Sequence, residues 1–130
     1  MAAVIGLTTC ITTVFAVDAV MSHIPEQVTK AEFTAAGHTY NVNFGDYKFK
    51  LDFESAKKMT FTSLIDPKVH ETVNIAVTKL RDNLFMVSWQ DKSGNNVVHI
   101  EDFKNMVVYT NISMKNGSFI HLKGYLTRVK

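Results

Sequence analysis

Disulfide chemistry and strong charge are both missing from this sequence. Its 130 residues include a single cysteine, Cys10, so no disulfide can form within the chain, and cysteine usage does not indicate the redox compartment. The formal net charge is only +2, and the longest basic cluster is the pair Lys57 and Lys58. Because no stripe of lysine and arginine with interleaved aromatic residues is present, we do not expect a nucleic acid partner.

The sequence also lacks the short motifs that mark common reaction sites. It has no glycine-rich phosphate loop, no serine in a nucleophile-elbow motif and no clustered cysteine or histidine spacing for a metal. We therefore expect no cofactor and no bound metal, and a non-enzymatic protein is favoured over an enzyme.

What the sequence does contain is a series of short strands. Between Leu84 and Ile112, three runs rich in β-branched and aromatic residues are separated by small clusters of turn-forming residues. The same rhythm continues on both sides of this stretch. It predicts an all-β domain with eight strands, at residues 38–44, 47–53, 59–64, 72–80, 84–90, 97–103, 106–112 and 119–129.

The connections between these strands favour an antiparallel up-and-down arrangement. Several are hairpin-sized, such as Gly45-Asp46 and Asn116-Gly117, and none is long enough for a crossover helix. Eight such strands most naturally close into an up-and-down β-barrel, because closure removes exposed strand edges. A barrel of this size either holds one small ligand or is filled by its own side chains.

The chain before Gly37 departs from the β pattern. Residues 1–20 are largely apolar, and three interpretations stay open: a signal peptide, a retained extra element, or a marginal membrane span. A signal peptide implies a periplasmic or secreted protein and a retained element a cytoplasmic one; a stable membrane span is not expected. Residues 21–36 predict a short helix or linker, with Ser22 as its cap and Pro25 in its first turn. Residues 37–130 form the predicted barrel domain.

Alternation along the strand at 97–103 gives the best candidate for a functional site. His99 and Glu101 share one face of this strand, roughly 6.5 Å apart along it. In a dry lumen the imidazole and the carboxylate could anchor a polar ligand, or act as an acid and a base. If the face points to solvent, or if the two side chains only bind each other, the pair has no part in binding.

The neighbouring strand adds an apolar wall under one assumption about register. If the loop at residues 91–95 pairs Gln90 with Asn96, the same face also carries Phe85, Val87 and Trp89. His121 on the last strand could add a second imidazole, although no local spacing indicates a metal site. The candidate ligand-binding set is therefore Phe85, Val87, Trp89, His99, Glu101 and His121.

Several segments of the chain resemble the MoaF-like family of small calycin barrels. They are VSWQ (87–90), VVHIEDF (97–103), VVYTNI (107–112) and GYLTRV (124–129), with GHTY (37–40), LDFES (51–55) and MTFT (59–62) upstream. The resemblance covers about residues 37–130. It implies a lipocalin-like barrel related in shape to phenolic acid decarboxylases. The family is named from an operon linked to molybdenum-cofactor or monoamine metabolism, and the resemblance implies no catalytic residue.

Three functions remain open at this point. The first is a binding module that holds a small apolar or aromatic molecule in its lumen. The second is an enzyme on the same scaffold, decarboxylase- or isomerase-like, in which His99 and Glu101 perform acid–base chemistry. The third is a structural or interaction protein with a filled barrel, whose apolar amino terminus contacts a second copy in a homodimer.

Overall fold

The computed structural model describes residues 25–130, and this part of the chain forms nine β-strands. They are β1 (Thr39–Asn43), β2 (Lys48–Phe53), β3 (Lys58–Ser63), β4 (His70–Asn74), β5 (Ala76–Arg81), β6 (Leu84–Gln90), β7 (Asn96–Asp102), β8 (Val107–Ser113) and β9 (Phe119–Arg128). The all-β prediction is confirmed. All but one of the predicted strands lie within one residue of their expected bounds.

The exception is the strand predicted at residues 72–80, which is two strands, β4 and β5, separated by Ile75. The backbone N–H of Ile75 donates to the carbonyl oxygen of Lys57 at 2.9 Å, between the ladder with β3 and the ladder with β6. Val73, Ile75 and Val77 are all buried, so the apolar alternation continues through the break. The sequence pattern therefore has no feature that marks the ninth strand.

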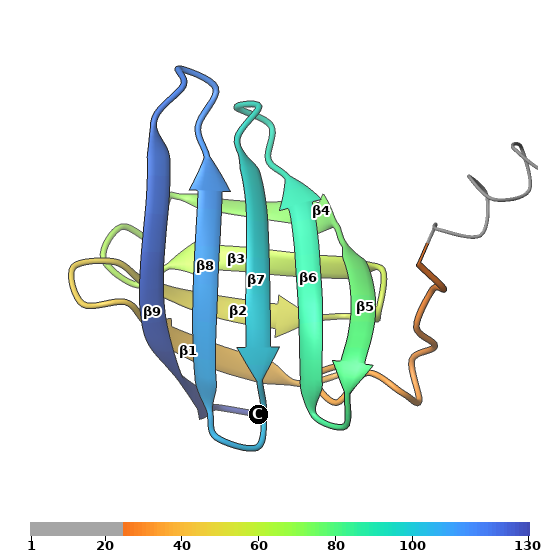
Figure 1. Cartoon of the computed structure of the whole chain (residues 1–130). Helices are drawn as coiled ribbons and strands as arrows, with labels where there is room; N and C mark the ends of the chain where they lie inside the picture. Colours follow the sequence, from red (N-terminus) through yellow and green to blue (C-terminus); the bar gives the residue numbers. More distant parts are fainter. Residues whose placement is uncertain (1–24) are drawn as a thin grey trace, which may run out of the picture.

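All nine strands belong to one antiparallel sheet, in the order β4-β3-β2-β1-β9-β8-β7-β6-β5. β1 pairs with β9, which joins the first and last strands of the described residues. Figure 1 shows β6 to β9 crossing in front of β1 to β4, and the core lies between these two layers. Within the described residues, only the seam between the edge strands β4 and β5 has no ladder, so the barrel is nearly closed.

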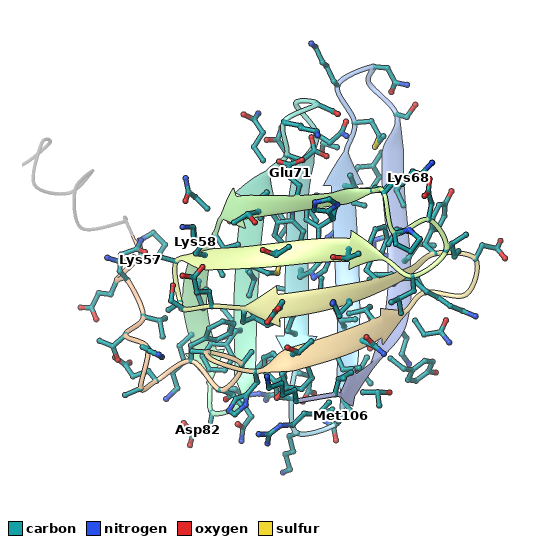
Figure 2. The ribbon with its side chains drawn as sticks, turned by 180° about the vertical axis from the view of Figure 1, so that it is seen from behind. Lys57, Lys58, Lys68, Glu71, Asp82 and Met106 are labelled. Atoms are coloured by element: carbon teal, nitrogen blue, oxygen red, sulfur yellow. The ribbon has the colours of Figure 1, made fainter. Side chains whose placement is uncertain are left out.

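The two ends of the barrel are named here by their turns. The open end carries the turns at residues 91–95 and 114–118, and the closed end carries those at 82–83 and 103–106. Figure 2 shows Lys68 toward the open end and Asp82 and Met106 at the opposite, closed end.

The segment before β1 covers the closed end without forming a helix. In the described residues 25–36 the helix prediction is wrong, because the backbone forms isolated turns. One N–H···O bond of helical spacing is present, from the Phe33 N–H to the Thr29 carbonyl at 3.2 Å, and no further turn extends it. Phe33 and Ala35 are buried in the barrel core, so tertiary packing overrides the weak local helix signal.

Residues 1–20 lie outside the described residues, so the three interpretations of this segment stay predictions. Among residues 25–130, no helix has the length and apolar character needed to cross a membrane.

Candidate functional site

A cavity of about 210 Å³ occupies the part of the lumen nearer the open end. Its wall consists mainly of apolar side chains, and the aromatic members are Phe44, Tyr47, Phe49, Phe61 and Trp89. Tyr47 is 54% exposed, so it stands at the mouth of the cavity, whereas Trp89 is buried inside. The strands thus enclose a space that their own side chains do not fill.

The aromatic wall is continuous across the barrel. The ring of Phe61 lies 6.2 Å from that of Phe49 and 6.4 Å from that of Trp89, measured between centroids. On the other side, Phe44 enters the lumen over Gly124 of β9. A Cβ atom at position 124 would lie 2.6 Å from the Phe44 ring, so glycine is required for this approach.

The register predicted between the strands before and after the 91–95 loop is confirmed. Gln90 pairs with Asn96, and this pairing places Trp89 opposite Val97, Val87 opposite His99, and Phe85 opposite Glu101. The inward-facing side chains Phe85, Val87, Trp89, His99 and Glu101 are all buried.

These five residues do not all reach the cavity. Trp89 and His99 line it, whereas Phe85, Val87 and Glu101 lie outside its wall. Phe85 belongs to the packed closed end, where its ring centroid lies 5.1 Å from that of Phe33. Of the predicted set, the structure therefore brings an indole and an imidazole to the cavity itself.

His99 and Glu101 form a buried pair beside the cavity. His99 Nδ1 lies 3.1 Å from Glu101 Oε1, and the carboxylate side chain is completely buried. With the proton on Nδ1, the imidazole donates to the carboxylate and its other nitrogen, Nε2, is an acceptor. The Trp89 ring meets His99 edge-on, with centroids 4.8 Å apart. The imidazole is therefore held in position by a hydrogen bond and by an aromatic neighbour.

Two polar atoms, one in this pair and one beside it, are buried without a hydrogen-bond partner among the described residues. They are Glu101 Oε2 and Thr110 Oγ1. Thr110 lies directly opposite His99 across the β7–β8 ladder, and both residues line the cavity. An unpaired buried polar group costs roughly 1–3 kcal/mol. This polar corner, defined as His99, Glu101 and Thr110, is therefore an unusual feature of an otherwise apolar interior.

Thr110 is absent from the predicted site residues, although the sequence holds the signal for it. A turn at Lys104 and Asn105 pairs residue 103 with residue 106, and continuing that register places Thr110 opposite His99. The structure has this register. Extending the register argument from β6 and β7 to β8 would therefore have added Thr110 to the candidate site.

His121 lies apart from the other candidates. Its side chain is exposed on the outer face of β9, where Nδ1 lies 2.6 Å from Asn111 Oδ1 and the ring stacks on Phe119. Side chains alternate along β9, so the residues that face the lumen are its neighbours Ile120 and Leu122. Within residues 25–130, no three histidine, cysteine or acidic side chains are grouped so as to hold a metal ion.

Charge is scarce around the cavity. Among the described residues, the wall includes no lysine or arginine, and its one acidic member is Asp91 at the rim. Both Asp91 carboxylate oxygens accept hydrogen bonds from Asn95 within the same turn. Burial raises the pKa of the Tyr40 hydroxyl above its ordinary value. The Arg128 charge opposes this rise, and the Glu101 charge adds to it. The Tyr40 hydroxyl therefore stays neutral.

Comparisons with known proteins agree with this architecture. A family model described as MoaF-like matches residues 36–127, which confirms the resemblance seen in the sequence. No curated protein matches the chain. A solved structure from Burkholderia vietnamiensis, named as a candidate β-lactamase, is similar with a TM-score of 0.71 and 21% identity, over 75% of this chain and 98% of that one. At this identity the likeness shows the fold alone.

Proposed function

We propose that this chain, which belongs to the MoaF-like family, is a binding protein for a small apolar or aromatic molecule held in the lumen. The observation that carries the proposal is the 210 Å³ cavity, with its aromatic wall and with His99 at its edge. Concave, mostly apolar pockets with a few polar groups are typical ligand sites. The proposed direct contacts are Trp89, His99, Phe44 and Phe61.

The size of the cavity limits the ligand. An engineered apolar cavity of about 150 Å³ is known to bind benzene. A space of about 210 Å³ therefore suits a single ring with a short substituent. A long acyl chain would extend past Tyr47 into solvent.

The filled-barrel alternative is less well supported, because the strands leave this part of the lumen unoccupied by side chains. The acid–base alternative has one specific observation in its favour: the 3.1 Å bond between His99 and Glu101 would orient an imidazole base. A test for it is the incorporation of deuterium next to the carbonyl of acetophenone in D2O. Exchange in the wild-type protein that is lost in His99→Gln would favour an enzyme.

Binding itself is tested by titration with toluene, followed by the emission of Trp89, the single tryptophan of the chain. Ile112→Phe adds a ring inside the cavity, and Ile100→Phe adds the same ring on the outer face of the barrel wall. We expect toluene binding to weaken at least tenfold in Ile112→Phe and to be unchanged in Ile100→Phe. Equal affinity in the two variants, or no toluene binding to the wild-type protein, would contradict the proposed function.

A further inference from the structure

The most informative feature beyond the cavity is the polar corner formed by His99, Glu101 and Thr110. Thr110 is 1% exposed and its hydroxyl has no partner among the described residues. His99 Nδ1 is engaged by Glu101, so Nε2 is the ring nitrogen left for another partner. Two groups that need hydrogen bonds therefore lie side by side on adjacent strands, in a wall that is mainly apolar.

We propose that the ligand is a neutral ring compound carrying a hydroxyl group, which enters hydroxyl-first and binds between His99 and Thr110. This inference rests on the proposed function and specifies the chemical class of the ligand. A hydroxyl group both donates and accepts, so it can donate to His99 Nε2 and accept from the Thr110 hydroxyl at the same time. Directly opposed residues on adjacent strands have Cβ atoms about 5 Å apart, close enough for one oxygen to reach both.

The side chains around the cavity disfavour a charged ligand. A carboxylate ligand would find no lysine or arginine in the described wall, and it would approach the buried carboxylate of Glu101. Burying an anion without a partner is costly. A cation would need the Glu101 charge, but the oxygen nearer the imidazole already accepts from His99 Nδ1, and Glu101 is not part of the cavity wall. A neutral hydroxyl group provides partners for His99 and Thr110 without burying a new charge.

The rest of the cavity determines the body of the ligand. Trp89 and Phe44 both contact the His99 ring, with centroids 4.8 Å and 6.0 Å away, so a ring bonded to the imidazole would lie among aromatic side chains. Aromatic rings favour edge-on or offset contacts with such neighbours. The corner sets the orientation of the ligand, and the aromatic wall supplies the apolar contact.

Phenol, toluene and benzoate test this proposal, because the three probes share one ring and differ only in the group presented to the corner. An apolar site would prefer toluene, since phenol must give up hydrogen bonds to water. We expect phenol to bind at least as tightly as toluene, and benzoate to bind at least tenfold more weakly than phenol. The readout is the emission of Trp89, checked by calorimetry.

Thr110→Val is the decisive variant, because it replaces the hydroxyl with a methyl group and removes no hydrogen bond seen in the fold. We expect the affinity for phenol to fall about three- to tenfold, which is the change expected from the loss of one net hydrogen bond. Toluene should bind equally well or better. Thr127→Val is the matched control, since Thr127 is exposed on the outer face of β9, and it should change neither affinity.

The outcomes separate the two proposals. The inference about the hydroxyl group is wrong if toluene binds more tightly than phenol, or if Thr110→Val does not change the affinity for phenol. The proposed binding function stands in both cases. If benzoate binds as well as phenol, the neutral-ligand assignment is wrong. If none of the three probes binds, the proposed function itself fails.

Discussion

The closed and open ends of the barrel are built from the same alternating strands and yet differ in what fills them. At the closed end, Phe33, Tyr40, Phe53, Phe85 and Phe103 form one cluster, with ring centroids 5.1–6.4 Å apart. At the open end the aromatic side chains instead surround a cavity of about 210 Å³. The strand pattern alone does not decide whether a stretch of lumen is packed.

The difference comes from a residue outside the strands. Phe33, from the turn segment before β1, places its ring edge-on against those of Phe53, Phe85 and Phe103. In the described part of the chain, no segment performs this role at the open end, where Phe44 approaches from the side over Gly124. One end is therefore a stabilising core, and the other is available for a ligand.

The largest effect should come from Phe33→Ala, which removes the central ring of the closed end. Truncating a buried phenylalanine costs about 3–5 kcal/mol, from lost apolar contact and the cavity left behind. We expect a loss of this size in the free energy of unfolding from urea denaturation. Phe119→Ala is the control, because Phe119 is 65% exposed and its loss should cost less than about 0.5 kcal/mol. Similar values for the two variants would mean that Phe33 does not pack as described.

Trp89→Ala tests the open end in the same way and should cost less, about 3 kcal/mol, the lower end of the range for a buried tryptophan. Part of the Trp89 side chain faces the cavity, so truncation removes fewer contacts than in a packed core. The affinity for toluene, measured by calorimetry because this variant has no tryptophan, should fall at least tenfold. A cost equal to that of Phe33→Ala, with unchanged affinity, would show that the open end is packed like the closed one.

Gly124→Ala should cost about 1–2 kcal/mol, because the new methyl group collides with the Phe44 ring. The double variant Gly124→Ala with Phe44→Ala isolates the cause. If the ring is the obstacle, the alanine at 124 should cost little once Phe44 is truncated, and the two changes should be non-additive. Additive effects would place the strain in the contact with the Asn43 carbonyl oxygen, which lies 2.9 Å from the position that the alanine Cβ atom would take.

The sequence predicted the strands well because alternation and turn residues are local signals. The Gln90–Asn96 register follows from one loop, and it correctly grouped Trp89, His99 and Glu101 on a buried face. The break at Ile75 could not be predicted, because the inward side chains keep their spacing across it. The helix expected over residues 21–36 was wrong in the described part because a buried Phe33, not local propensity, determines that backbone.

The site was harder to predict than the fold. His121 was included in the candidate set, but both faces of the last strand carry apolar side chains, so composition did not show which face is inside. Whether the lumen is open depends on Phe33, which reaches the closed end from outside the strand pattern. The polar corner combines β7 with β8, whereas the 91–95 loop aligns β6 with β7, so finding Thr110 requires the register of the next turn as well.

The smallest effect concerns the turn at the closed end, where Asp102 accepts hydrogen bonds from the backbone N–H groups of Lys104 and Asn105 at 3.0 and 2.9 Å. The bonds from Asn105 hold the pKa of Asp102 below its ordinary value of 3.8, and burial only partly opposes them. Since the folded-state pKa is the lower one, the stabilisation is present above the unfolded-state value and is lost as the pH falls through the folded-state value. Solvent screening limits this stabilisation to a few tenths of a kcal/mol.

Urea denaturation of the wild-type protein and Asp102→Asn should show a difference in stability at pH 7 that shrinks toward pH 3. A difference independent of pH would mean that the turn depends on the shape of the side chain and not on its charge. In either case toluene binding at the open end should not change, because Asp102 is separated from the cavity by the packed rings of the closed end.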